Sequence, residues 1–94
     1  MRAWRIAIAP LAAERIRALH PDLKHAVRAA LDEIARNPDS GSALQRELAG
    51  LRKYRVRRYR LVFRVVPALR EIRILAFGHR SSIYEEVALA VRAR

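Results

Sequence analysis

The chain has 94 residues and a formal net charge of +11, so it is small and strongly basic. This length suffices for one modest core, and we expect residues 1–94 to form a single domain. The absence of cysteine excludes disulfides, thiolate metal sites and redox chemistry at sulfur, and it suits a reducing cytoplasm. The one short apolar stretch, 6–13, is interrupted by Pro10 and cannot cross a bilayer. We therefore expect a soluble cytoplasmic protein without membrane contact, cofactor or bound metal.

The positive charge is concentrated in one block of the sequence. Residues 51–80 contain ten basic side chains against a single acidic one, Glu71, whereas 1–50 and 81–94 are nearly balanced. Nine of the ten are arginines, whose planar guanidinium suits bidentate contacts with phosphate. Nucleic acid is therefore the expected class of partner, and a surface that only aids solubility is the alternative.

The N-terminal half predicts a strand and two helices. Residues 4–9 alternate with the period of a strand that has one buried face, and Pro10 ends it. Apolar residues at helical spacing predict a first helix over 11–20 and a second over 23–37, with Asp22 as the N-cap of the second. The segment 38–50 predicts a loop with one helical turn directed into the core.

The C-terminal half predicts three strands and a closing helix. Apolar and basic residues alternate over 54–57, 60–65 and 72–77, with short turns near 58–59 and 67–70, which is typical of an antiparallel meander. Gly78 is expected to break the last strand. Ser82 followed by Glu85 is a capping-box pattern, and Ile83, Val87, Ala90 and Val91 give the closing helix an apolar face.

The order β-α-α-β-β-β-α predicts an α+β fold: a twisted, mainly antiparallel four-stranded sheet with two helices packed on one face and a short C-terminal helix. Strict alternation places Ile72, Ile74 and Ala76 toward the helices, and Leu75 and Phe77 on the opposite face. That second face would either receive the last helix or a partner's helix, or form an ordinary second core. Arg55 and Arg57 should point to one side of their strand, where the next strand can add Arg60 and Arg64.

These residues resemble a known family. The runs Leu48–Arg57, Tyr59–Val65, Gly78–Arg80 and Ile83-Tyr84, in this order and spacing, are similar to the core signature of RelE-type toxins of the RelE/ParE superfamily. The resemblance implies the toxin of a type II toxin–antitoxin system, a metal-independent endoribonuclease that enters the ribosomal A site and cleaves messenger RNA. In that chemistry the ribose 2′-OH attacks the adjacent phosphate, which leaves a cyclic phosphate and a 5′-OH.

The resemblance also assigns roles to residues. Arg55 and Arg57 match two basic residues of the active strand, Arg60 and Arg80 match phosphate-stabilising arginines, and Tyr84 matches a tyrosine that orients or stacks on a base. Arginine is a poor general base, so His79 is the candidate for proton transfer, and cleavage should then be lost in His79→Ala. The predicted catalytic set is Arg57, Arg60, His79, Arg80 and Tyr84. The predicted RNA- and phosphate-binding set is Arg52, Lys53, Arg55, Arg58 and Arg64.

The expected partners follow from the same resemblance. They are a cognate antitoxin protein that forms a hetero-oligomer with the chain and covers or displaces the last helix, messenger RNA in the ribosomal A site, and operator DNA only through the antitoxin. Two other functions remain open from the sequence: a ParE-like inhibitor of DNA gyrase, and a non-catalytic RNA-binding module.

Overall fold

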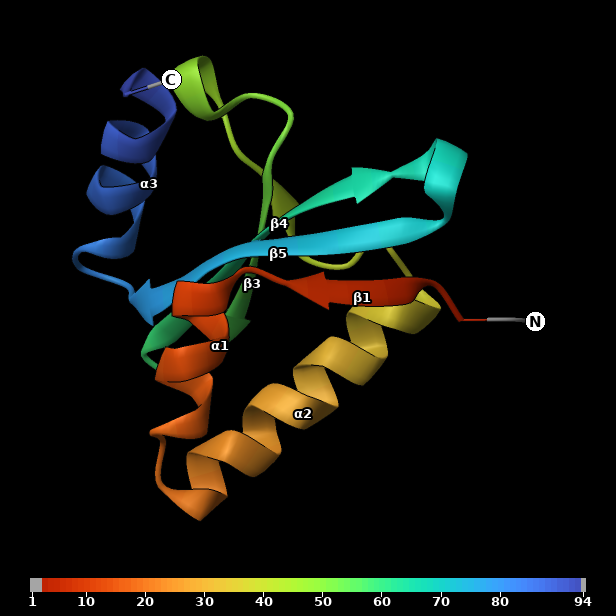
Figure 1. Ribbon diagram of the computed structural model, residues 1–94, viewed down its shortest axis with the longest axis vertical. Coiled ribbons are helices and arrows are strands. Elements are labelled where there is room, and N and C mark those ends of the chain that lie inside the picture. The colour runs from red at the N-terminus through yellow and green to blue at the C-terminus, as the bar shows by residue number, and fades with distance from the viewer. Residues whose placement is uncertain (1–2, 94) are drawn as a thin grey trace.

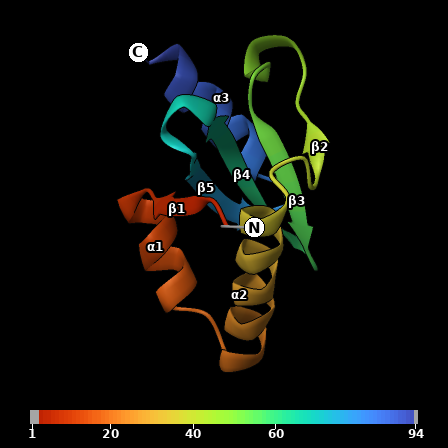
Figure 2. The same ribbon diagram turned by 90° about the vertical axis from the view of Figure 1, so that its right-hand side faces the viewer.

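The computed structural model describes residues 3–93. The chain folds into a five-stranded sheet with two helices on one face and a third helix on the other (Figures 1 and 2). The elements in chain order are β1 (Arg5–Ile8), α1 (Pro10–Arg17), α2 (Pro21–Arg36), β2 (Ser42–Ala43), β3 (Arg52–Val56), β4 (Tyr59–Val66), β5 (Glu71–His79) and α3 (Ile83–Arg92). Short 3-10 turns at Arg46–Leu48 and Pro67–Leu69 complete them. The predicted α+β fold is confirmed.

The sheet has the strand order β1-β5-β4-β3-β2. The meander β3–β4–β5 is antiparallel as predicted, and β1 joins β5 in parallel, since the α1–α2 hairpin and the meander separate them in the chain. The expected count of four strands was wrong. Strand β2 is only two exposed residues long and pairs with Arg52 and Lys53 at the sheet edge, so no periodic pattern in the sequence marks it.

Gly41 allows β2 to approach β3. Its φ of +81° is favourable only for glycine, and a Cβ atom at this position would lie 2.0 Å from the carbonyl oxygen of Lys53. We predict that Gly41→Ala lowers the free energy of unfolding by about 2 kcal/mol or more and detaches β2. Gly50 is a matched control, because its φ is +93° but its Cβ would meet open space. Chemical denaturation of both variants should show the larger loss for Gly41→Ala; equal losses would contradict the steric argument.

The start of α2 differs in detail from the prediction. Asp22 was expected to be the N-cap, but His20 holds that position, and its Nδ1 accepts a hydrogen bond of 3.4 Å from the Asp22 backbone N–H. Pro21 occupies the first helical turn, where its missing N–H costs nothing. The end of α2 at Asn37 is as predicted.

The last helix begins after Ser82 as expected, but Ser82 makes no side-chain capping bond, so the capping-box prediction was wrong. Gly78 does not break the last strand either. It lies within β5 opposite Arg60, and a Cβ there would come within 2.9 Å of the Ile83 side chain. The glycine therefore lets α3 pack closely on the sheet instead of ending it.

Two separate cores lie on the two faces of the sheet. The larger one joins α1 and α2 to the sheet and includes Phe63, Ile74 and Phe77, and the smaller one joins α3 to Val62 and Ala76. The second face is thus a core covered by the chain's own helix. A β-bulge between Val62 and Phe63 in the pairing with β5 reverses the alternation, because Val62 pairs with Ala76 and Phe63 with Ile74.

The bulge corrects the prediction for the end of β5. Phe77 was expected on the α3 side and Ala76 on the side of α1 and α2, but the structure exchanges them. A slip of one residue moves every later side chain to the opposite face. His79 consequently lies opposite Tyr59, on the face that carries Phe77.

The start of β5 carries an acidic group between two cations. Arg73 Nε donates a 2.6 Å hydrogen bond to Glu71 Oε1, and Arg5 Nη2 lies 3.5 Å from Oε2. The hydrogen bond from Arg73 is the largest cause of a pKa of Glu71 below its ordinary value. Burial opposes it, and the charges of Arg73 and Arg5 lower the pKa further.

A lowered folded-state pKa stabilises the native state above the unfolded value of about 4.5, and this contribution is lost as the pH falls through the folded value. We predict that Glu71→Gln flattens the acid limb of the stability profile below about pH 4.5 and leaves its shape near neutral pH unchanged. Thermal unfolding of both proteins across this range checks it. Parallel acid limbs would contradict the assignment.

Candidate nucleic-acid interface

The β3–β4 hairpin brings three cations to the α3 side of the sheet. Arg55 and Arg60 are direct cross-strand partners, so their side chains share a face, and Lys53 lies two residues before Arg55 on the same face. Together with Gly41, Ser42 and Tyr54 these three residues line an open pocket of about 430 Å³. We call Lys53, Arg55 and Arg60 the cation cluster.

The charge of the cation cluster is not neutralised by acidic side chains. The ion pairs found within residues 3–93 engage Arg5, Arg15, Arg36, Arg73 and Arg92, and none involves the cation cluster. Three neighbouring cations without a carboxylate create a local positive potential that attracts an anion. A phosphate group has the charge and the acceptor geometry that such a cluster binds.

Arg60 is held in place by the turn that precedes it. Its Nη1 donates hydrogen bonds to the backbone oxygens of Arg57, at 3.0 Å, and Tyr59, at 2.8 Å. One end of the guanidinium is thereby fixed, while Nε and Nη2 remain for a ligand. A fixed donor loses little freedom when it binds an anion, which is the condition for preorganised electrostatic stabilisation.

Tyr84 connects α3 to the cation cluster. The Lys53 ammonium lies 5.5 Å from the centre of the Tyr84 ring, within range of a cation–π contact. The Tyr84 hydroxyl is buried in the smaller core without a hydrogen-bond partner. Tyr84 is therefore a half-buried side chain that contacts Lys53 with its ring and places its hydroxyl in the smaller core.

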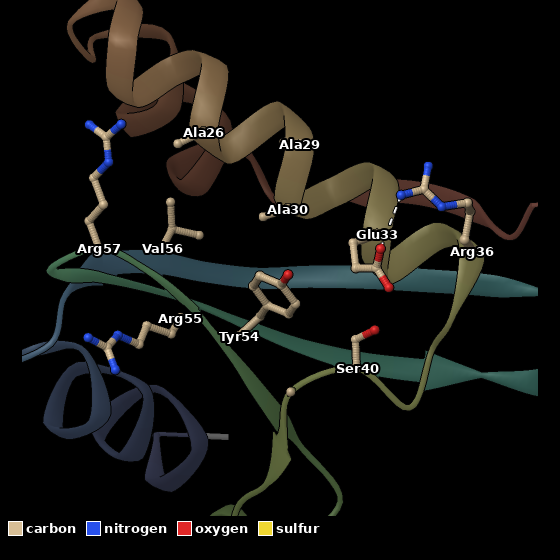
Figure 3. A pocket seen from close by; sticks show the side chains of 11 residues that line it. Ala26, Ala29, Ala30, Glu33, Arg36, Ser40, Tyr54, Arg55, Val56 and Arg57 are labelled. Carbon is tan, nitrogen blue, oxygen red and sulfur yellow. Dashed lines mark hydrogen bonds and ion pairs between the residues drawn. The ribbon is translucent and has the colours of Figure 1, made fainter.

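Arg57 does not share a side with Arg55, which corrects the prediction. β3 ends at Val56, and Arg57 with Arg58 forms the two-residue turn, where Arg57 has a φ of +56°. Figure 3 shows Arg55 directed toward α3 and Arg57 directed toward α2. The predicted turn at 58–59 was one residue late, and this shift moved Arg57 off the strand.

Arg52 has a structural contact instead of an open binding position. Its Nη2 donates hydrogen bonds to the backbone oxygens of Asp39, at 2.7 Å, and Gly41, at 3.3 Å. Its Nε is buried without a partner. The side chain thus fastens the loop before β2 to the start of β3.

His79 lies on the other face of the sheet from the cation cluster. The centres of the His79 and Tyr59 rings are 5.8 Å apart in a T-shaped arrangement, and His79 Nδ1 lies 2.8 Å from Ser81 Oγ. It lines a different pocket, shared with Arg15 and Tyr59. The structure places His79 on the opposite face of the sheet from Arg55 and Arg60, next in the chain to Arg80.

The remaining predicted residues lie at the hairpin tip and farther along β4. The Arg80 backbone N–H donates a 2.8 Å hydrogen bond to the Arg58 carbonyl, so these exposed arginines stand side by side at the hairpin tip. Arg64 is exposed farther along β4. It lines a hollow together with Leu75 of β5 and Val87 of α3. Lys53 was predicted only as a binding residue. It is the one side chain of the cation cluster that can transfer a proton, because arginine keeps its own. Its contact with Tyr84 depends on the tertiary fold.

No helix of the described chain is long and apolar enough to cross a membrane. Within residues 3–93, no group of three or more histidine, aspartate or glutamate side chains gathers as metal ligands would.

Comparison with known proteins identifies the family. The model of the ParE toxin of type II toxin–antitoxin systems, parDE, matches residues 6–84. No curated protein sequence matches the chain. The toxin–antitoxin complex RelBE2 from Mycobacterium tuberculosis is similar in structure, with a TM-score of 0.75, 29% identity, and coverage of 86% of this chain and 95% of that chain.

Two other solved structures share the fold. A mutant of the E. coli toxin RelE in the free state has a TM-score of 0.76 at 18% identity, covering 98% of this chain and 99% of that one. The archaeal RelE–RelB complex from Pyrococcus horikoshii has a TM-score of 0.69 at 19% identity, with coverages of 83% and 96%. The match to the family model over most of the chain and these likenesses agree, and the chain belongs to the RelE/ParE superfamily of toxins from type II toxin–antitoxin systems.

Proposed function

We propose that the chain is a metal-independent endoribonuclease that cleaves messenger RNA in the ribosomal A site. The cation cluster carries this proposal. Lys53, Arg55 and Arg60 converge on one pocket without acidic partners, and such a pocket suits a phosphate that gains negative charge during the reaction. The RelE-like fold of the described chain is consistent with the same activity.

In the proposed reaction the ribose 2′-oxygen attacks the adjacent phosphorus and the bond from phosphorus to the 5′-oxygen breaks. The 2′-OH loses a proton and the leaving 5′-oxygen gains one, so the products are a cyclic phosphate and a 5′-OH. Arg55 and Arg60 stabilise the charge on the phosphorane. Because arginine keeps its proton, Lys53 is the member of the cluster that donates a proton to the leaving 5′-oxygen, and water takes the proton of the 2′-OH. Arg58 and Arg80 at the hairpin tip, with Arg57 on the α2 side, bind flanking phosphates.

An antitoxin protein is the proposed partner. The similar chains of M. tuberculosis and P. horikoshii were solved as toxin–antitoxin complexes. A chain of net charge +11 attracts an acidic protein, and an acidic partner would also oppose the approach of RNA.

The proposal is tested by expressing the chain from an inducible promoter in bacteria and mapping the 5′ ends of cellular RNA. We expect new 5′-OH ends within translated codons, and the same cuts in purified ribosomes programmed with messenger RNA. Growth arrest without new RNA ends would overturn the proposal.

A second candidate function is inhibition of DNA gyrase, and the match to the ParE model is the observation that favours it. A gyrase inhibitor needs no proton-transfer group near the arginines. Supercoiling assays with purified gyrase separate the two functions. Inhibition of gyrase together with intact ribosomal messenger RNA would favour this candidate.

A further inference from the structure

The last part of β5 has a neighbouring strand on one side only among the described residues. Strand β1 pairs with β5 from Glu71 to Ile74 and ends there, whereas β4 accompanies β5 along its length. The side chain of Arg15, from α1, lies beside this part of β5, and its Nη1 donates a 3.0 Å hydrogen bond to the carbonyl oxygen of Phe77. Arg15 is thus attached to the backbone of the strand near its end.

The same guanidinium also binds α3. Its Nη1 lies 2.9 Å from Oε2 of Glu86 and its Nη2 lies 3.1 Å from Oε1, so the two side chains form a bidentate pair. Helices α1 and α3 pack on opposite faces of the sheet, and Arg15 joins them past the end of β5 (Figure 1). The other ion pair of α3, between Arg92 and Glu47, is longer at 3.9 Å and more exposed. The pair of Arg15 and Glu86 is therefore the closer electrostatic attachment of α3.

Gly78 provides the room for this crossing. A Cβ atom on Gly78 would lie 2.9 Å from Ile83 Cδ1 and 3.4 Å from Arg15 Nη1. Only a residue without a side chain lets both groups come this close to the strand. The end of β5, the Arg15 guanidinium and the first residue of α3 therefore meet at one point.

We propose that Arg15 is a positioning residue: through Glu86 it fixes α3 on the sheet, and α3 in turn holds Tyr84 against Lys53. Glu86 follows Tyr84 by two residues in the first turn of α3, so the two side chains move together with the helix. The Tyr84 ring centre lies 5.5 Å from the Lys53 ammonium, close to the limit of about 6 Å for a cation–π contact. A helix shift of about 1–2 Å, which is common in such rearrangements, is enough to break it.

This inference rests on the proposed nuclease function only for its effect on cleavage. Lys53 is the proposed proton donor, so its placement affects the rate of the chemical step more than the affinity for RNA. A pair that only stabilised the fold would have a different effect. Its loss would lower the stability of the chain and leave Lys53 in place beside Tyr84.

The test is an NMR measurement on the full chain labelled with ¹³C at the lysine ε-position, which gives two signals because Lys24 and Lys53 are the only lysines. The Tyr84 ring shifts the Lys53 signal, and Tyr84→Leu measures this ring shift by removing it. We expect Arg15→Gln to lose about half of the ring shift or more, while the Lys24 signal stays in place. Arg17→Gln removes the same charge from an exposed position of α1 and should keep the whole shift.

Variants of the partner show whether the two side chains act as a pair. Glu86→Gln should lose the ring shift as Arg15→Gln does, and the double variant should lose no more than either single one. Glu85→Gln, on an exposed position of the same helical turn, is the matched control and should keep the shift. Arg15→Lys keeps a charged donor without the planar fork and should restore part of the shift. Circular dichroism checks that each variant is folded.

Single-turnover cleavage is the second measurement. Arg15→Gln should cleave ribosome-bound messenger RNA about tenfold more slowly with unchanged binding to ribosomes, whereas Arg17→Gln should cleave normally. Equal ring shifts in Arg15→Gln and Arg17→Gln would overturn the inference, whatever the cleavage rates. If the unaltered chain cuts no RNA but the Lys53 signal responds as expected, the nuclease proposal fails and the inference stands.

Discussion

Replacing Arg60 by alanine is expected to reduce cleavage of ribosome-bound messenger RNA by about 10²–10³-fold. The guanidinium is fixed to the backbone oxygens of Arg57 and Tyr59, and it stands opposite Arg55 in the pocket. The guanidinium is thus held beside the pocket before the substrate arrives. The effect should fall mainly on the rate of the chemical step, because the charge on the phosphate increases there.

Two comparisons make this prediction specific. Arg60→Lys keeps the charge but loses the planar fork, so it should recover only part of the rate. Arg28→Ala removes the same charge from the exposed surface of α2, away from the pocket, and should cleave normally. Single-turnover cleavage on purified ribosomes gives the rates, and circular dichroism checks the fold. Equal losses in Arg60→Ala and Arg28→Ala would show that only overall charge matters.

The helices and strands with a regular apolar pattern over many residues could be predicted from the sequence. Helix α2 presents Val27, Ala30 and Ile34 at helical spacing, and all three are buried in the larger core. The meander follows from alternation over three strands. These signals are reliable because burial of one face imposes its period on many residues at once.

The wrong predictions come from shifts of a single residue, in a bulge or a turn, which do not change the apolar pattern of the sequence. The bulge at Val62 and Phe63 moved Phe77 into the larger core and His79 to the face away from the cation cluster. The turn at Arg57 and Arg58 starts one residue earlier than predicted, which turned Arg57 toward α2. In each case the strand was predicted correctly, but the face on which its side chains lie was not. A shift of one residue moves the side chains of a strand to the opposite face of the sheet.

The same rule explains which site residues came together. Arg55 and Arg60 lie before the bulge and next to the turn, so their pairing follows directly from a two-residue hairpin. Lys53 gains its importance from Tyr84, which is 31 positions away in the sequence and reaches it only through the packing of α3. No local pattern could have indicated that contact.

We expect Lys53, and not His79, to be the side chain that donates the proton. Lys53 lies in the pocket with Arg55 and Arg60, whereas His79 lies across the sheet against Tyr59 and Ser81. A group that transfers a proton must come within hydrogen-bond reach of the reacting oxygen.

Lys53→Arg keeps the positive charge but cannot give up a proton, so cleavage should fall about a hundredfold or more while binding to ribosomes is retained. His79→Ala should cleave at nearly the normal rate, because it removes a ring that lines another pocket. The two variants are compared by single-turnover cleavage and by co-sedimentation with ribosomes. If His79→Ala loses cleavage and Lys53→Arg keeps it, the histidine must reach the phosphate by a rearrangement of the end of β5, and the assignment to Lys53 is wrong.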